Sequence, residues 1–147
     1  MNCADLLPRV ALESLLMGVY GTIVLVFAFQ VKHLIVDFLL QPPYMWKNKG
    51  KLFHPGGWLH AGLHGVTTFL LIWKLSPAGD DHLRQIFLLS LGETLAHFLI
   101  DFAKVNVCEF FDWRANTSPK YWYMLGLDQF LHQVCYLTIT LLYLTTL

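Results

Sequence analysis

The sequence has little charge and no excess of either sign. Only 14% of its 147 residues are Asp, Glu, Lys or Arg, and ten basic side chains balance ten acidic ones. Proteins that bind nucleic acids carry a basic excess that contacts phosphates, so this balance argues against a nucleic-acid partner. By contrast, 56% of the chain is hydrophobic. That content is too high for a soluble domain of this size and predicts an integral membrane protein in contact with a lipid bilayer.

Cysteine is scarce and forms no recognisable pattern. Cys3, Cys108 and Cys135 are far apart and lack the C-x-x-C spacing, so we interpret them as packing residues instead of disulfide partners or metal ligands. The amino terminus lacks the basic region and the small-residue cleavage site of a secretory signal. No internal repeat or low-complexity tract is present. We therefore expect a single domain over residues 1–147, with its first apolar segment retained.

Four apolar segments are long enough to cross a bilayer, which takes about 20 residues of helix. They cover residues 17–40, 57–75, 83–105 and 122–147, and the stretches between them are rich in residues typical of loops. Residues 4–16 are amphipathic and predict a short helix in the membrane interface. The predicted fold class is all-α, an integral membrane four-helix bundle with antiparallel, up-down topology.

Basic residues are distributed unevenly over the two ends of this predicted bundle. Six of them follow the first and third spans: Lys47, Lys49, Lys51, Lys104, Arg114 and Lys120. The other end holds Arg9, Lys74 and Arg84. Because lysine and arginine favour cytoplasmic loops, the first group is expected in the cytoplasm, and both termini are expected outside it.

Each predicted span carries ionisable residues four positions apart. They are His33 and Asp37 in the first span, His60 and His64 in the second, Glu93, His97 and Asp101 in the third, and Asp128 and His132 in the fourth. This spacing puts the side chains of a set on one helix face, about 6 Å apart. Because the chain reverses at each loop, all four sets fall toward the cytoplasmic end. We expect a layer containing the three aspartates and His60, and a layer of the other four histidines about one turn deeper.

Ionisable side chains inside a membrane cost about 3 kcal/mol or more each unless they are paired or hydrated. Nine of them at matching depth predict a bound cation. Histidine nitrogen and carboxylate oxygen are ligands of zinc, iron and manganese, and we expect one or two such ions per chain. Two alternatives stay open: the His and Asp side chains could satisfy one another without metal, and Asp101 could pair with Lys104, three residues later on the same face.

Four segments, HLIVDFLLQPPYM, LHAGLH, HFLIDFAK and LDQFLH, follow one another within residues 30–135. With these segments the chain resembles a family of small bacterial and phage integral membrane proteins of unknown function. It is similar, more loosely, to small membrane proteins described as metal-dependent hydrolases. The first resemblance implies a bacterial inner-membrane or phage-encoded protein, and the second implies hydrolysis.

The combined patterns favour an intramembrane metalloenzyme, a hydrolase acting on a lipid-linked or other membrane-associated substrate. A metal would activate water, Asp37, Asp101 or Asp128 could act as general base, and Lys104 would bind an anionic head group. The lysines of the KNKGK loop could assist it or simply contact anionic lipids. Three alternatives remain: a metal-ion or proton carrier or channel, a bis-histidine haem protein, and a non-catalytic protein stabilised by metal.

Overall fold

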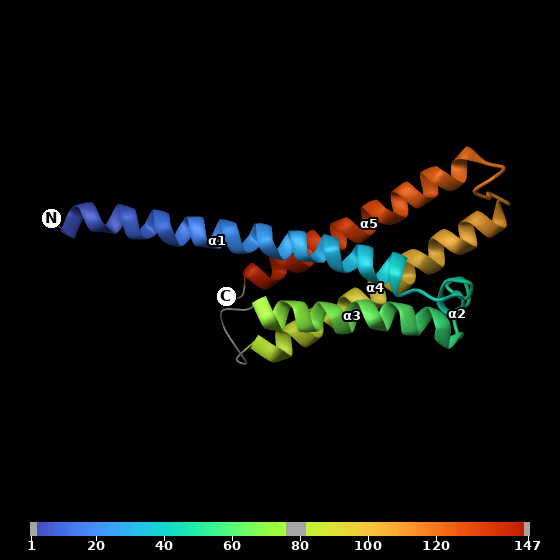
Figure 1. Cartoon of the computed structure of the whole chain (residues 1–147), viewed down its shortest axis with the longest axis horizontal. Coiled ribbons are helices and arrows are strands. Elements are labelled where there is room, and N and C mark those ends of the chain that lie inside the picture. Colours follow the sequence, from blue (N-terminus) through green and yellow to red (C-terminus); the bar gives the residue numbers. More distant parts are fainter. Residues whose placement is uncertain (1–2, 76–81, 146–147) are drawn as a thin grey trace.

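The protein is an assembly of helices. The computed structural model describes residues 3–75 and 82–145, with side chains from residue 18 onward, and this described part contains helices and no strand. The elements are α1 (Cys3–Leu34), the π-helical turn η1 (Ile35–Leu39), α2 (Pro43–Trp46), α3 (Pro55–Leu75), α4 (Leu83–Phe110) and α5 (Pro119–Leu144). The four long helices alternate in direction (Figure 1). α4 packs against both α3 and α5, and α1 contacts the same two helices.

The first helix is longer than the sequence patterns predict. α1 is continuous from Cys3 to Leu34, so the predicted short helix over residues 4–16 is not a separate element but the first part of α1. No glycine or proline stands between Pro8 and Gly18 to end the helix there. The backbone therefore carries the helical hydrogen-bond pattern straight into the first apolar span.

Local capping chemistry determines the helix ends around the α4–α5 connection. α4 continues to Phe110, past the predicted end at residue 105, and stops where Asp112 adopts a left-handed backbone with φ 51°. The polar NVCEFF stretch looks like a loop in composition but contains no helix breaker. α5 begins at Pro119 instead of 122, because the Ser118 hydroxyl accepts a hydrogen bond from the Lys120 backbone N–H at 3.3 Å and proline suits the first helical position.

A π-helical turn replaces the last turn of the first span. In η1 the Leu40 N–H donates to the Ile35 carbonyl at 3.0 Å, one residue further back than in an α-helix. Such turns are rare and occur often at functional sites. This one contains Asp37, and Pro42 and Pro43 follow it and prevent the helix from continuing.

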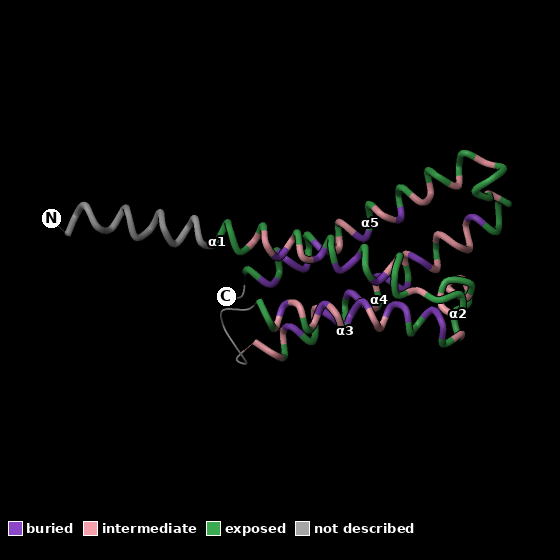
Figure 2. Tube along the Cα trace, viewed as in Figure 1, coloured by how far each residue is buried: buried purple, intermediate pink, exposed green. Residues whose placement is uncertain are grey.

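The bundle buries many polar side chains and exposes a largely apolar surface. Its buried polar side chains are Lys32, His33, His60, His64, Thr68, Ser90, Glu93, His97, Asp101, Asp128, His132 and Thr140. Buried positions line the interior between the helices, whereas outward positions are exposed (Figure 2). Many exposed side chains are large and apolar, such as Phe27 at 66% and Leu141 at 63% exposure. Soluble proteins rarely expose so much apolar surface.

Two helical segments within the described residues, Gly18–Leu39 and Leu83–Phe110, are long and apolar enough to cross a membrane. This finding supports membrane association for the first and third predicted spans. For α3 and α5 a membrane-spanning role remains a prediction.

An apolar core fills the half of the bundle that lies beyond the polar cluster. It consists of Leu25, Phe29, Ile72, Ile86, Tyr136, Ile139 and Tyr143, contributed by all four long helices. Phe29 and Tyr136 stack with ring centroids 5.0 Å apart. This core holds the four helices together at one end and so helps to position the polar residues at the other.

The close contact between α3 and α4 depends on Gly65. A Cβ atom there would collide with the Thr94 hydroxyl and would lie 2.9 Å from the Ser90 carbonyl oxygen, whereas a Cβ at Gly62 would meet nothing within 4 Å. We expect Gly65→Ala to lower the free energy of unfolding by about 1–3 kcal/mol. Gly62→Ala, in the same helix, is expected to leave it unchanged or raise it by up to about 1 kcal/mol. Denaturant titration in detergent micelles, followed by circular dichroism, measures both; equal effects would contradict the close approach.

Candidate metal centre

The four sets of ionisable residues lie together inside the bundle. Each set occupies the inward face of its helix: the first set lies on the end of α1 and on η1, and the others lie on α3, α4 and α5. Six of these side chains place potential ligand atoms close enough to hold metal ions, in two groups that share His97. The groups are Asp37, His60, His64 and His97, and His97, Asp101 and His132.

The first group surrounds one carboxylate oxygen of Asp37. Asp37 Oδ1 lies 2.9 Å from Nε2 of His60 and 3.3 Å from Nε2 of His64. Nε2 of His97 lies 3.0 Å from Nε2 of His60 and 3.8 Å from Asp37 Oδ1. All the ligand atoms of the group are within 4.8 Å of one another. The three imidazoles are at most 1% exposed, so these rings are shielded from bulk water.

The second group continues from the same histidine toward α5. Asp101 Oδ2 lies 3.3 Å from Nε2 of His97, and Asp101 Oδ1 lies 3.9 Å from Nε2 of His132. Metal–ligand bonds of about 2.1 Å in a tetrahedral site place ligand atoms about 3.4 Å apart. The separations in both groups bracket this value. A mixed set of imidazole nitrogens and carboxylate oxygens suits a divalent transition metal, so either group could hold an ion.

The two layers expected from helix depth contact each other through their side chains. Asp37 reaches His64 of the expected deeper layer as well as His60 of its own layer. Depth along an ideal α-helix predicts where a Cα lies, whereas η1 departs from that geometry and side chains extend several ångströms along the bundle. Ligand atoms of both layers therefore belong to one group.

Three predicted ligands lie beside the two groups instead of within them. His33 Nε2 lies 3.1 Å from both Asp37 Oδ2 and Gln129 Oε1, so this ring connects a ligand of the first group to a side chain of α5. Asp128 Oδ1 lies 3.6 Å from His132 Nε2, and the Gln129 amide donates to Asp128 Oδ2 at 3.1 Å. Contacts of this kind orient metal-binding side chains.

The third of these residues, Glu93, forms a buried ion pair with Lys32. Lys32 is 6% exposed, and its ammonium also donates to the Thr68 hydroxyl at 2.9 Å. The Tyr136 hydroxyl lies 3.5 Å from the same ammonium and 2.8 Å from His33 Nδ1, so it joins this pair to the histidines. Sequence reasoning missed Lys32 and Tyr136. A lysine inside an apolar span itself indicates a buried partner of opposite charge. Tyr136 extends the four-residue spacing of Asp128 and His132 by one step.

Two residues from the α1–α3 connection complete the cluster. The Lys49 ammonium lies 2.8 Å from Asp101 Oδ2 and 3.9 Å from Asp37 Oδ1. The lysine that pairs with Asp101 is therefore Lys49, and Lys104, the alternative partner considered from sequence, instead places its ammonium 5.6 Å from the centre of the Tyr121 ring. The Gln41 amide lies 3.0 Å from the His60 imidazole. Loop residues such as these carry no helical periodicity, so spacing could not reveal their positions.

Comparison with known proteins identifies a family but no characterised relative. The family model described as "Protein of unknown function (DUF3307)" matches residues 25–147, which include every residue of the candidate metal centre. Neither the curated proteins nor the solved structures gave a significant match to this chain.

Proposed function

Since this chain belongs to the DUF3307 family, whose description assigns no function, we propose a function from its site: a membrane-embedded metalloprotein that hydrolyses a membrane-associated substrate. It binds one or two divalent transition-metal ions, with zinc, iron and manganese as the candidates. The observation that carries the proposal is the convergence of six ligand side chains from four helices into two groups that share His97. The ligands are Asp37, His60, His64, His97, Asp101 and His132.

The charge inside the bundle supports a bound cation. Four carboxylates, those of Asp37, Glu93, Asp101 and Asp128, have side chains at most 8% exposed. Among the described residues, the lysines that form ion pairs with them are Lys32 and Lys49. Two negative charges are left, and buried charges are costly unless they are balanced. One divalent ion would balance both.

Protonation of both His60 and His97 is a poorer solution to the same imbalance. Nε2 of His60 and Nε2 of His97 lie 3.0 Å apart and face the same two aspartates. Two N–H groups directed at each other across that distance would repel, so the two rings cannot both present a proton there. A shared cation instead uses both nitrogens as ligands, which requires them unprotonated.

A metal ion at this position would supply Lewis acidity and lower the pKa of a bound water molecule. Asp128 is the residue we assign as general base. It is 4% exposed, lies outside both ligand groups, and its Oδ1 accepts no hydrogen bond from the described residues. Gln129 holds the other carboxylate oxygen, which leaves Oδ1 able to accept a proton from water. Asp37 is an alternative base, although its contacts with four histidines favour a ligand role.

We place the centre at the cytoplasmic side of a bacterial inner membrane, with both termini on the opposite side. The distribution of basic residues supports this placement. Lys49, Lys104 and Arg114 lie at the same end of the bundle as the metal ligands, and basic residues near the ends of spans favour the cytoplasm.

Two alternatives fit the site less well. A carrier would need polar ligands along the whole bundle, but the apolar core around Phe29 and Ile72 fills the half beyond Lys32. Bis-histidine haem needs a porphyrin between two imidazoles, whereas the rings of His64 and His97 stack directly on each other with centroids 3.6 Å apart.

Asp128→Asn tests the catalytic part of the proposal. We expect the variant to keep its metal but to hydrolyse a lipid ester or phosphoester about 10²–10⁴ times more slowly, because it loses the proton acceptor. Lys51→Gln removes the charge of an exposed side chain that donates to Asn48 and is the control, with an expected rate equal to that of the unmodified protein. Metal content by elemental analysis and turnover on both substrate classes are measured together. An unchanged rate in Asp128→Asn would exclude this base, and no turnover by the metal-loaded protein would exclude a hydrolase of these substrates.

A further inference from the structure

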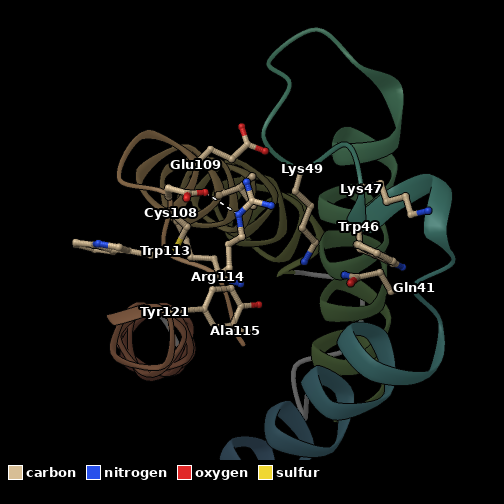
Figure 3. A pocket seen from close by; sticks show the side chains of 13 residues that line it. Gln41, Trp46, Lys47, Lys49, Cys108, Glu109, Trp113, Arg114, Ala115 and Tyr121 are labelled. Atoms are coloured by element: carbon tan, nitrogen blue, oxygen red, sulfur yellow. Dashed lines mark hydrogen bonds and ion pairs between the residues drawn. The ribbon is translucent and has the colours of Figure 1, made fainter. Parts of the chain in front are cut away.

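A pocket of about 890 Å³ opens beside the candidate metal centre (Figure 3). Its walls come from the chain around α2 and from the α4–α5 connection with the adjoining helix turns. The side chains that our argument uses are Gln41, Lys49, Lys104, Arg114, Trp113 and Tyr121. A pocket of this size is typical of small-molecule sites.

The inner end of the pocket reaches the metal ligands. Lys49 and Gln41 both line the pocket, and each also contacts a predicted ligand: the Lys49 ammonium lies 2.8 Å from Asp101, and the Gln41 amide lies 3.0 Å from His60. In the view of Figure 3 the Lys49 side chain extends between Arg114 and Gln41. A molecule in the pocket would therefore lie one side chain away from the centre.

The charge of the pocket favours an anion. Lys49 is already paired with Asp101, and the other basic residues that line the pocket are Lys47, Lys104 and Arg114, against the acidic Glu109 and Asp112. Asp112 already receives a hydrogen bond from Arg114 Nε at 2.6 Å, which leaves the terminal nitrogens of the guanidinium available. Guanidinium and ammonium groups bind phosphate oxygens through charge-assisted hydrogen bonds.

We propose that this pocket binds the phosphate group of the substrate, with Lys104 and Arg114 as the contacting residues. The assignment rests on the proposed function, since it makes the pocket the substrate site of the metal centre. The phosphate could belong to a lipid head group or to a small soluble molecule. Trp113 and Tyr121 line the same pocket, and such aromatic residues gather at the head-group level of a membrane. This position gives a lipid phosphate direct access.

Native mass spectrometry of the full-length protein released from detergent tests the proposal, because one spectrum reports bound metal and bound ligand together. The probes are phosphatidylglycerol, diacylglycerol, which has no phosphate, and inorganic phosphate. We expect phosphatidylglycerol to be retained in preference to diacylglycerol. We also expect Lys104→Gln and Arg114→Gln each to weaken retention about tenfold, the effect of one lost charge-assisted hydrogen bond. Lys51→Gln removes a charge from an exposed side chain that donates to Asn48 and is the matched control.

The possible outcomes separate the two proposals. Retention of phosphatidylglycerol alone identifies a lipid phosphate, and retention of inorganic phosphate alone identifies a soluble one. Either result supports the phosphate site if Lys104→Gln weakens the retention and Lys51→Gln does not. Equal retention of diacylglycerol, or equal loss in Lys51→Gln, would overturn the phosphate site. Species that carry phosphate without metal would overturn the metal function, whereas the phosphate site would stand. Species that carry metal without phosphate would overturn the phosphate site, whereas the metal function would stand.

Discussion

His97→Ala is expected to abolish metal binding. His97 belongs to both ligand groups, so its removal takes a ligand nitrogen from whichever group holds an ion. Because loss of a residue that merely orients a ligand weakens metal binding about 10–100-fold, loss of a shared ligand should weaken it by more than about 100-fold. Competition with a chromogenic chelator, combined with elemental analysis of the purified variant, measures the change.

His54→Ala provides the control for this experiment. His54 accepts a hydrogen bond from the Gly56 backbone N–H in the loop before α3 and lies outside both ligand groups. The control should bind as many ions as the unmodified protein, with the same affinity. Circular dichroism establishes that both variants keep their helices. If His97→Ala retained the full number of ions at unchanged affinity, the shared-ligand arrangement would be wrong.

Lys32→Met is expected to cause the largest loss of stability. The substitution leaves the Glu93 carboxylate without its partner at a site where both side chains are at most 4% exposed. Breaking a buried ion pair in this way costs about 3–5 kcal/mol, since the remaining charge is neither paired nor hydrated. The double variant Lys32→Met/Glu93→Gln removes both charges and should recover most of that loss. Denaturant titration in detergent micelles measures the free energy of unfolding of the unmodified protein and of both variants.

A surface variant distinguishes this effect from a general loss of lysine. Lys51→Met changes an exposed lysine, and its free energy of unfolding should stay within about 0.5 kcal/mol of the unmodified value. A double variant as unstable as Lys32→Met would show that the instability comes from the lost packing of Lys32 and not from an unpaired Glu93.

Among the described residues, helical spacing predicted eight of the twelve buried polar side chains of the bundle. His60 and His64 are four residues apart, and the α-helix places them on one face whatever surrounds it. The reversal of direction at each loop then predicted that all four sets meet at one end. Both inferences need only the geometry of a regular helix, which is why they could be made without tertiary information.

The same reasoning could not identify partners across the bundle. Glu93 shares its helix face with His97, but the Lys32 ammonium lies opposite it, and spacing along α4 contains no information about α1. Lys49 and Gln41 come from a connection without periodicity. The π-helical turn at Asp37 also escapes a pattern based on 3.6 residues per turn. Contacts of this kind depend on how helices and loops pack, and that packing follows from the whole sequence.

The central claim is that the interior of this bundle holds a transition-metal ion. The most direct test is elemental analysis of the protein purified in detergent from cells grown without added metal. We expect one or two ions of zinc, iron or manganese per chain. A folded, helical protein that carries no stoichiometric metal, and that takes up none of the three on incubation, would contradict the claim.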